Sequence, residues 1–246
     1  MRTPGRVVTI ASRETAMTVD VAKNLAAVRE RIEAAAARAG RRAEEVLLIG
    51  VSKTVEVERI RQALAAGLPA LGENRVQEAK AKIEALGHPV PWHLVGTLQT
   101  NKARDAVRLF DLIHSLDRPE LSRELDRRAR AQGKVVEALV EVNLGGEATK
   151  GGVVPTELKA FLAEIASLEG VRVKGLMAIP PLVEDPEASR PWFRQLRELR
   201  DVAASWGVPG IELDQLSMGM SADFEVAIEE GATMVRVGTA IFGPRD

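Results

Sequence analysis

The chain has 246 residues, 46% of them hydrophobic, and 34 basic residues nearly cancel 35 acidic ones to leave a net charge of −1. This balance disfavours nucleic acid, an acidic polymer or a membrane surface as partner, and the absence of cysteine excludes disulfides and thiolate chemistry. No apolar run approaches the roughly 18 residues of a membrane span, so we expect a cytoplasmic, single-domain protein that binds a small molecule. We also expect a monomer, because the closed barrel predicted below needs no partner to complete its site.

The predicted elements follow a regular alternation along the chain. Residues 1–17 are aperiodic and lack a secretory signal, which predicts a disordered leader ahead of a domain over residues 18–246. A leading helix over residues 19–39 comes first, and apolar strand-like runs then alternate with amphipathic stretches, the pattern of a parallel sheet. We predict eight strands, over residues 46–52, 70–72, 92–96, 112–115, 135–143, 171–178, 211–217 and 234–237.

The intervening helices carry terminal signals. Gly67 and Gly231 are the expected stops of two of them. Eight strands, each leading into a helix in this length, predict a single α/β domain, a (β/α)8 TIM-type barrel, with an open doubly wound sheet as the alternative. The expected N-caps and helices are Thr54 for residues 55–66, Asp117 for residues 118–132, Ser189 for residues 189–206 and Ser221 for residues 222–230.

Common nucleotide and metal signatures are missing from the sequence. No glycine-rich dinucleotide fingerprint follows the first strand, and no Gly-Lys-Ser/Thr phosphate loop occurs. His88, His93 and His114 show no metal-ligand spacing, so we predict no metal site.

Lys53 ends the first predicted strand, at the edge where barrels of this type carry their active sites. An amine that is partly desolvated there has a lowered pKa and reacts as a nucleophile with an aldehyde. A solvated lysine at the end of a strand is the alternative interpretation.

The seventh and eighth strands run into segments that combine small residues, hydroxyls and a helix start, over residues 216–221 and 236–243. Backbone N–H groups at a helix start suit a phosphate dianion, and glycine lets the backbone approach it closely. Capping by Ser221 or a turn at Gly238 explains either segment alone. Because both lie where this fold binds phosphate, we favour a phosphate site.

A reactive lysine facing a phosphate site predicts a phosphorylated aldehyde as ligand, and pyridoxal 5′-phosphate fits. Arg236 is placed to reach its pyridine nitrogen, and Asn74 to hydrogen-bond its rim. Met177 is placed to pack against the ring, although a methionine there is more often part of the core.

Six segments together resemble the pyridoxal phosphate homeostasis protein family over residues 18–246. They are residues 51–54, 72–78, 93–102, 175–180, 217–221 and 233–243. The resemblance implies the alanine racemase N-terminal barrel, pyridoxal phosphate on Lys53, and a role in vitamin B6 and amino-acid homeostasis. It also implies that Ser217, Ser221, Gly238 and Thr239 hold the phosphate. The complete predicted cofactor-binding set is Lys53, Asn74, Met177, Ser217, Met220, Ser221, Arg236, Gly238 and Thr239, with no catalytic residue.

Two further positions bear on the resemblance. Arg75 follows the Glu-Asn pair where the family pattern has a small aromatic residue, a departure that changes the rim of the site rather than the Schiff base. Lys150 matches a lysine common in the family, and its role is open between a second aldehyde acceptor, an electrostatic helper and a solvated loop lysine.

Three functions would use the same lysine. We favour a non-catalytic carrier, whose reversible Schiff base on Lys53 protects pyridoxal phosphate and releases it in transient contacts with apo-enzymes. An amino-acid racemase is the alternative, but it needs an acid or base on each face of the cofactor, and the chain has no tyrosine or cysteine. The chain also ends after the barrel, where racemases of the fold carry a further β-domain. A Schiff-base aldolase is the third function, without a clearly placed acid/base pair.

Overall fold

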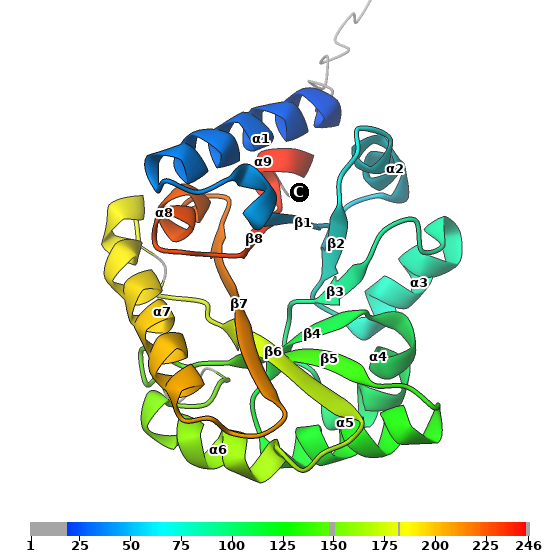
Figure 1. Cartoon of the computed structure of the whole chain (residues 1–246). Helices are drawn as coiled ribbons and strands as arrows, with labels where there is room; N and C mark the ends of the chain where they lie inside the picture. The colour runs from blue at the N-terminus through cyan, green and yellow to red at the C-terminus, as the bar shows by residue number, and fades with distance from the viewer. Residues whose placement is uncertain (1–18, 148–150, 182, 245–246) are drawn as a thin grey trace, which may run out of the picture.

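The computed structural model describes residues 19–147, 151–181 and 183–244, which form a closed barrel of parallel strands ringed by helices (Figure 1). Each strand pairs with the next, and the last pairs with the first, so the sheet has no free edge. This confirms the predicted barrel and excludes the open sheet. The strands are β1 (Leu47–Val51), β2 (Ala70–Glu73), β3 (Trp92–Leu94), β4 (Leu112–Leu116), β5 (Val136–Glu141), β6 (Val171–Met177), β7 (Ile211–Met220) and β8 (Met234–Val237).

Helices connect the strands on the outside of the barrel. The helix that leads the described residues packs against the last two, beside the point where β1 and β8 close the barrel (Figure 1). The helices are α1 (Val21–Arg38), α2 (Val57–Ala65), α3 (Val76–Leu86), α4 (Ala103–Leu109), α5 (Pro119–Ala131), α6 (Leu158–Ile165), α7 (Arg190–Ser205), α8 (Phe224–Glu229) and α9 (Thr239–Phe242).

Several strands differ from their predicted extents, among them β7, β3 and β5, which ends at Glu141 rather than residue 143. β7 continues to Met220, three residues past its expected end, because Met220 pairs with Arg236 after a shift in the β7–β8 register. β3 ends at Leu94, before Gly96. A Cβ on Gly96 would lie 2.5 Å from the Asn74 carbonyl oxygen, so a glycine there lets the loops that follow β2 and β3 touch.

Two predicted N-caps of helices are wrong. Thr54 does not cap α2, which has Glu56 at its N-cap; Thr54 instead has a left-handed φ of 61°. Ser221 does not cap α8, which begins after Asp223. Its hydroxyl instead accepts hydrogen bonds from the segment that follows β8. In both cases a contact from outside the helix decides the conformation.

The other two predicted N-cap side chains do not bond to their helices either, whereas the two predicted helix stops are confirmed. α5 has Arg118 at its N-cap, and Asp117 forms an ion pair with that arginine. Ser189 does occupy the N-cap position of α7, but its hydroxyl bonds Asp223 rather than the helix. Gly67 and Gly231 follow their helices with φ of 83° and 100°, as stop residues require.

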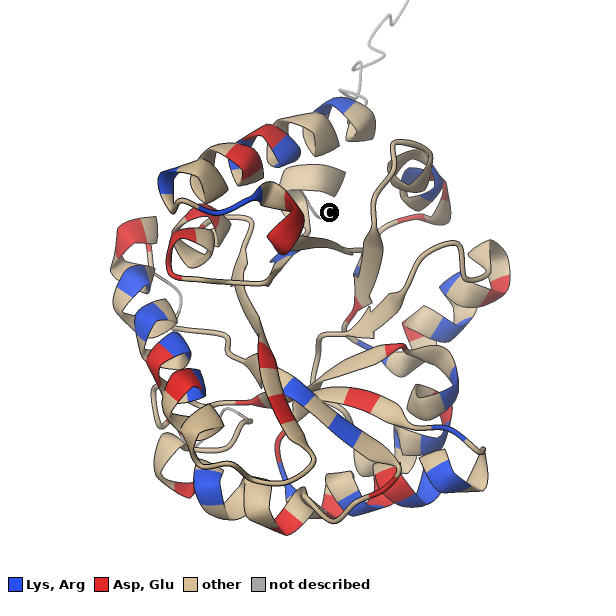
Figure 2. Cartoon of the chain, viewed as in Figure 1, with Lys and Arg blue, Asp and Glu red and all other residues tan. Residues whose placement is uncertain are grey.

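The core has two parts, one between strands and helices and a smaller one inside the barrel. Charged residues of both signs alternate along the outer helices, as α1, α5 and α7 show in Figure 2. Among the described residues, no helix has the length and apolar character needed to cross a membrane. The inner cluster comprises Ile49, Ala70, Leu112, Leu139, Met177 and Met234.

Candidate functional site

The predicted site residues gather at the C-terminal end of the barrel, as expected. Because Gly50 pairs with Val237 across the β1–β8 seam, the turn after β1 and the turn after β8 are neighbours. The two turns carry Lys53 on one side and Gly238 on the other. The remaining predicted residues are Asn74 after β2, Met177 at the end of β6, Ser217 and Met220 on β7, Ser221 after it, Arg236 on β8 and Thr239 at the start of α9.

Lys53 is half-buried and lines a hollow of about 670 Å³ together with Asn74. Arg75 and Lys102 line the same hollow, and no carboxylate of the described residues does. Within the described part of the chain, the Lys53 ammonium makes no hydrogen bond or ion pair. The amine is therefore available at the wall of a basic hollow, which suits an anionic aldehyde.

Ser221 joins the two loops predicted to hold phosphate. Its Oγ accepts hydrogen bonds from Gly238 N at 3.1 Å and Ala240 N at 3.3 Å. The hydroxyl oxygen therefore lies where two backbone N–H groups converge, an arrangement that also suits a phosphate oxygen. Thr239 lies between the two donors and is exposed.

Gly219 allows this loop to pack closely. Its φ is 88°, and a Cβ there would lie 2.5 Å from the Ala227 Cβ and 2.9 Å from the Phe224 Cα. A larger residue at this position would push the loop away from α8.

Arg236 and Ser217 lie deeper, inside the barrel. The Arg236 guanidinium donates to Ser217 Oγ at 2.5 Å and to the Ala178 carbonyl at 2.9 Å. Both side chains are buried, so Ser217 contacts the arginine rather than the loops around Ser221. Burial lowers the pKa of Arg236 to about 10, with Glu141 opposing the shift, so the guanidinium stays protonated at neutral pH.

Two histidines extend this buried hydrogen-bonded chain. Ser217 Oγ lies 2.9 Å from His114 Nδ1, and His114 Nε2 lies 3.0 Å from His93 Nδ1. Burial lowers the pKa of His93 to about 4 and that of His114 well below its ordinary value, so both rings are neutral at pH 7. Sequence reasoning considered these histidines only as metal ligands. Among the described residues, no cluster of His, Asp and Glu suits a metal ion.

Glu141, at the end of β5, is a second residue that sequence reasoning missed. Burial raises its pKa to about 7; the repulsion from Asp117 adds to the shift and the attraction to Arg236 opposes it. Its buried Oε2 has no hydrogen-bond partner within the described residues. A single glutamate after an apolar strand carries no sequence signal for such an environment.

Lys82 and Glu78, on α3, were also missed. Lys82 is buried and bonds both Glu78 and Glu73, next to the turn that carries Lys53. A Glu-Lys pair four residues apart usually indicates an exposed helix face. The available signal was that Lys82 adjoins Ile83 on the apolar face of the helix.

Two predicted residues, Met177 and Met220, have less direct contact with this site. Met177 is fully buried in the inner core, the alternative that the sequence left open for it. Met220 donates its N–H to Asp223 and lines a separate small hollow with Pro180. Lys150 and residues 1–17 lie outside the described residues.

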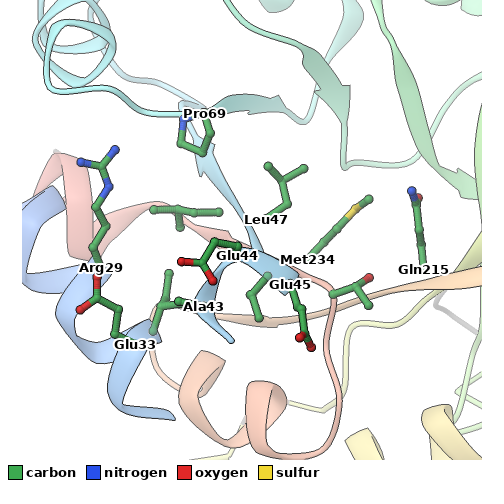
Figure 3. A pocket seen from close by; sticks show the side chains of 13 residues that line it. Arg29, Glu33, Ala43, Glu44, Glu45, Leu47, Pro69, Gln215 and Met234 are labelled. Carbon is green, nitrogen blue, oxygen red and sulfur yellow. The ribbon is translucent and has the colours of Figure 1, made fainter. Parts of the chain in front are cut away.

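A further hollow, of about 560 Å³, lies at the opposite end of the barrel. Figure 3 shows the side chains of Leu47, Gln215 and Met234 approaching it from the strands, with Arg29 and Glu33 from α1 beside them. None of the predicted cofactor-binding residues lines it. The hollow at this end is therefore separate from the predicted cofactor site at the other end of the barrel.

Known proteins resemble the chain over nearly its whole length. A family model for the alanine racemase N-terminal domain matches residues 23–246. A pyridoxal phosphate homeostasis protein of Aquifex aeolicus is 50% identical over 228 residues, which cover 92% of this chain and 99% of that protein. The structure of PipY from Synechococcus elongatus with pyridoxal phosphate bound has a TM-score of 0.80 at 40% identity, covering 91% of this chain and 100% of that one. An alanine racemase of Clostridium difficile, matched over 57% of its length and 91% of this chain, has a TM-score of 0.70 at 18% identity, a likeness of fold alone.

Proposed function

Since the chain belongs to the alanine racemase N-terminal domain family and, within it, to the pyridoxal phosphate homeostasis proteins, we propose that it holds pyridoxal phosphate as a reversible Schiff base on Lys53. In this role it helps to maintain intracellular vitamin B6 and amino-acid balance without substantial catalysis. The observation that carries the proposal is the unpaired amine of Lys53 at a basic hollow, on a turn that neighbours the turn after β8 to which Ser221 is hydrogen-bonded.

The residues at this end of the barrel fit the parts of the cofactor. The Ser221 hydroxyl, whose oxygen accepts from the N–H groups of Gly238 and Ala240, has its own hydrogen to donate to a phosphate oxygen. The positive charges of Arg75 and Lys102 favour entry of a dianion. We assign the remaining predicted contacts, those of Asn74, Met177, Ser217, Met220, Arg236 and Thr239, as part of the same proposal.

The cofactor would supply an aldehyde carbon to which the amine of Lys53 would form a C=N bond with loss of water, and hydrolysis would reverse the step without oxidant or reductant. The chain's own residues bind the anion and hold their protons. Ser221 and the turn after β8 anchor the anion. Arg236 keeps its own proton at neutral pH because its pKa is about 10.

A carrier suits these residues better than a racemase. Racemisation needs an acid or base on each face of the cofactor, and the sequence has no tyrosine or cysteine to serve opposite Lys53. The names of the close relatives support the same choice. We further propose that the protein acts as a cytoplasmic monomer and meets apo-enzymes transiently, as predicted from the sequence.

Borohydride reduction with pyridoxal phosphate, followed by peptide mapping, tests the attachment site. Label should appear on the peptide that contains Lys53. Lys53→Ala should lose the visible absorbance band and keep the far-UV circular dichroism, whereas Lys102→Ala, which changes a lysine of the same hollow, should keep the band. Label confined to Lys150, or scattered over surface lysines, would contradict the assignment.

A further inference from the structure

The backbone around Lys53 is held by side chains from another part of the chain. Lys82 Nζ donates to the Ser52 carbonyl oxygen at 2.5 Å. Thr54 N donates to Glu78 Oε1 at 2.6 Å. These two backbone groups belong to the peptide units on either side of the Lys53 Cα, so both units that set the direction of its side chain are anchored to α3.

The two anchoring side chains are themselves joined. Lys82 Nζ donates to Glu78 Oε1 at 2.7 Å and to Glu73 Oε1 at 2.6 Å. Ser52 Oγ also donates to Glu73 Oε1, at 2.6 Å. The ammonium thus contacts two carboxylates and one carbonyl, which leaves it little freedom to move.

Burial makes this cluster an unusual way to hold a helix against a barrel. Glu73 and Ser52 have no exposed surface, and only 6% of Lys82 is exposed. Moving charges out of water costs several kcal/mol per ion, and apolar residues of similar size often stabilise a protein at least as well. Apolar residues would, however, leave the Ser52 carbonyl without this donor and the Thr54 N–H without this acceptor. The cluster therefore holds the backbone on both sides of Lys53 by hydrogen bonds, which apolar packing could not do.

The conformation of Thr54 adds a second reason for an anchor. Among the described residues, it is the only non-glycine with a positive φ. A left-handed conformation is unfavourable for a non-glycine residue and persists only where the surroundings hold it. The carboxylate of Glu78 on its N–H supplies such a hold immediately after Lys53.

We propose that Lys82 and Glu78 are positioning residues that aim the amine of Lys53 at the bound aldehyde. The proposal rests on the function proposed for Lys53. Without the two anchors the turn occupies several conformations, and the apparent affinity for an aldehyde falls in proportion to the fraction that remains competent. Binding of the phosphate depends on other loops and is not affected.

Two ligands separate positioning from general damage. Pyridoxal phosphate requires the amine, whereas pyridoxine 5′-phosphate has the same ring and phosphate but no aldehyde. Glu78→Ala should weaken pyridoxal phosphate by about tenfold and pyridoxine phosphate by less than about twofold, for a competent fraction near one tenth. Glu78→Gln keeps an acceptor oxygen and should restore most of the loss. Lys82→Met removes the other anchor and should behave like Glu78→Ala if it folds.

A readout without cofactor tests the anchor directly. In the cofactor-free protein, amide hydrogen exchange at Thr54 should be slow in the wild type and at least about tenfold faster in Glu78→Ala, because its acceptor is gone. Glu230→Gln is a matched control, since it weakens another buried carboxylate cluster, with Arg194 and Arg197, on the far side of the barrel. It should change neither the exchange at Thr54 nor either affinity.

Two outcomes would overturn the proposal. Equal losses for both ligands would mean that the cluster only supports the fold, and faster exchange at Thr54 with unchanged pyridoxal phosphate affinity would mean that the anchor does not orient the amine. Failure of the underlying function is distinguishable, because borohydride would then label the wild-type protein somewhere other than Lys53.

Discussion

The carboxyl group of Glu141 gives a sharp prediction about stability and pH. Burial raises its pKa from the ordinary 4.5 to about 7, with Asp117 adding to the shift and Arg236 opposing it. At 1.36 kcal/mol per pKa unit, this corresponds to roughly 3 kcal/mol. The folded protein binds this proton more tightly than the unfolded chain does, so the contribution is full below pH 4.5 and is lost as the pH rises through 7.

Glu141→Gln isolates this contribution because glutamine resembles the protonated carboxyl group. The free energy of unfolding of the variant should match the wild type near pH 4.5 and exceed it by roughly 3 kcal/mol at about pH 8. Urea unfolding followed by circular dichroism measures the free energy of unfolding of the variant and of the wild type at each pH. Glu137→Gln, on the same strand, controls for the substitution itself. A difference between Glu141→Gln and the wild type that does not change with pH would refute the reasoning.

Burial lowers the pKa of His93 from 6.5 to about 4, so its contribution to stability is present above pH 6.5 and lost as the pH falls through 4. His93→Gln should remove roughly 3 kcal/mol of this dependence in urea titrations, and an unchanged slope would contradict the shift. Ser221→Ala removes the acceptor of two backbone N–H groups and should weaken pyridoxal phosphate about three- to tenfold in spectral titrations. Unphosphorylated pyridoxal should bind far more weakly than the phosphate ester and be insensitive to the change; equal losses would count against a phosphate site. With L-alanine in deuterated water, chiral analysis should find no repeated turnover to the D-form, because the sequence has no tyrosine to act on the second face of the cofactor. Repeated turnover that disappears in Lys53→Ala would establish a racemase instead.

The strands were largely predictable because parallel strands buried on both faces are apolar runs. β8 has its predicted ends, residues 234 and 237. β7 was predicted too short because the glycine and polar residues of Ser217 to Ser221 interrupt the apolar run. Its extension depends on pairing of Met220 with Arg236, which local sequence does not encode.

The N-caps predicted at Thr54 and Ser221 were wrong for a related reason. The sequence around Ser221 matches a helix start, but the hydroxyl bonds Gly238, 17 residues further along the chain. A capping pattern describes only the neighbouring residues. Where a distant segment offers better donors, the local pattern is overridden.

The site was partly predictable on the same grounds. Lys53 was singled out in the sequence because a charged residue at the end of an apolar strand is conspicuous at the active end of a barrel. The anchors of its backbone were not, since Lys82 bonds Ser52 across 30 residues and Glu78 bonds Thr54 across 24. Such partners look like ordinary surface charges until the fold brings them together.

The buried chain from Arg236 through Ser217 and His114 to His93 has a consequence for how the barrel assembles. It crosses the interior from β8 through β7 and β4 to β3, which includes strands that are not neighbours in the sheet. A strand that slipped by one residue would turn its member of the chain toward the helices and leave its partners buried without hydrogen bonds. At about 1–3 kcal/mol for each such group, a mis-staggered closure would lose much of the roughly 5–15 kcal/mol that separates a folded domain from its unfolded chain. The hydrogen bonds among these four side chains therefore favour the correct strand register when the sheet closes.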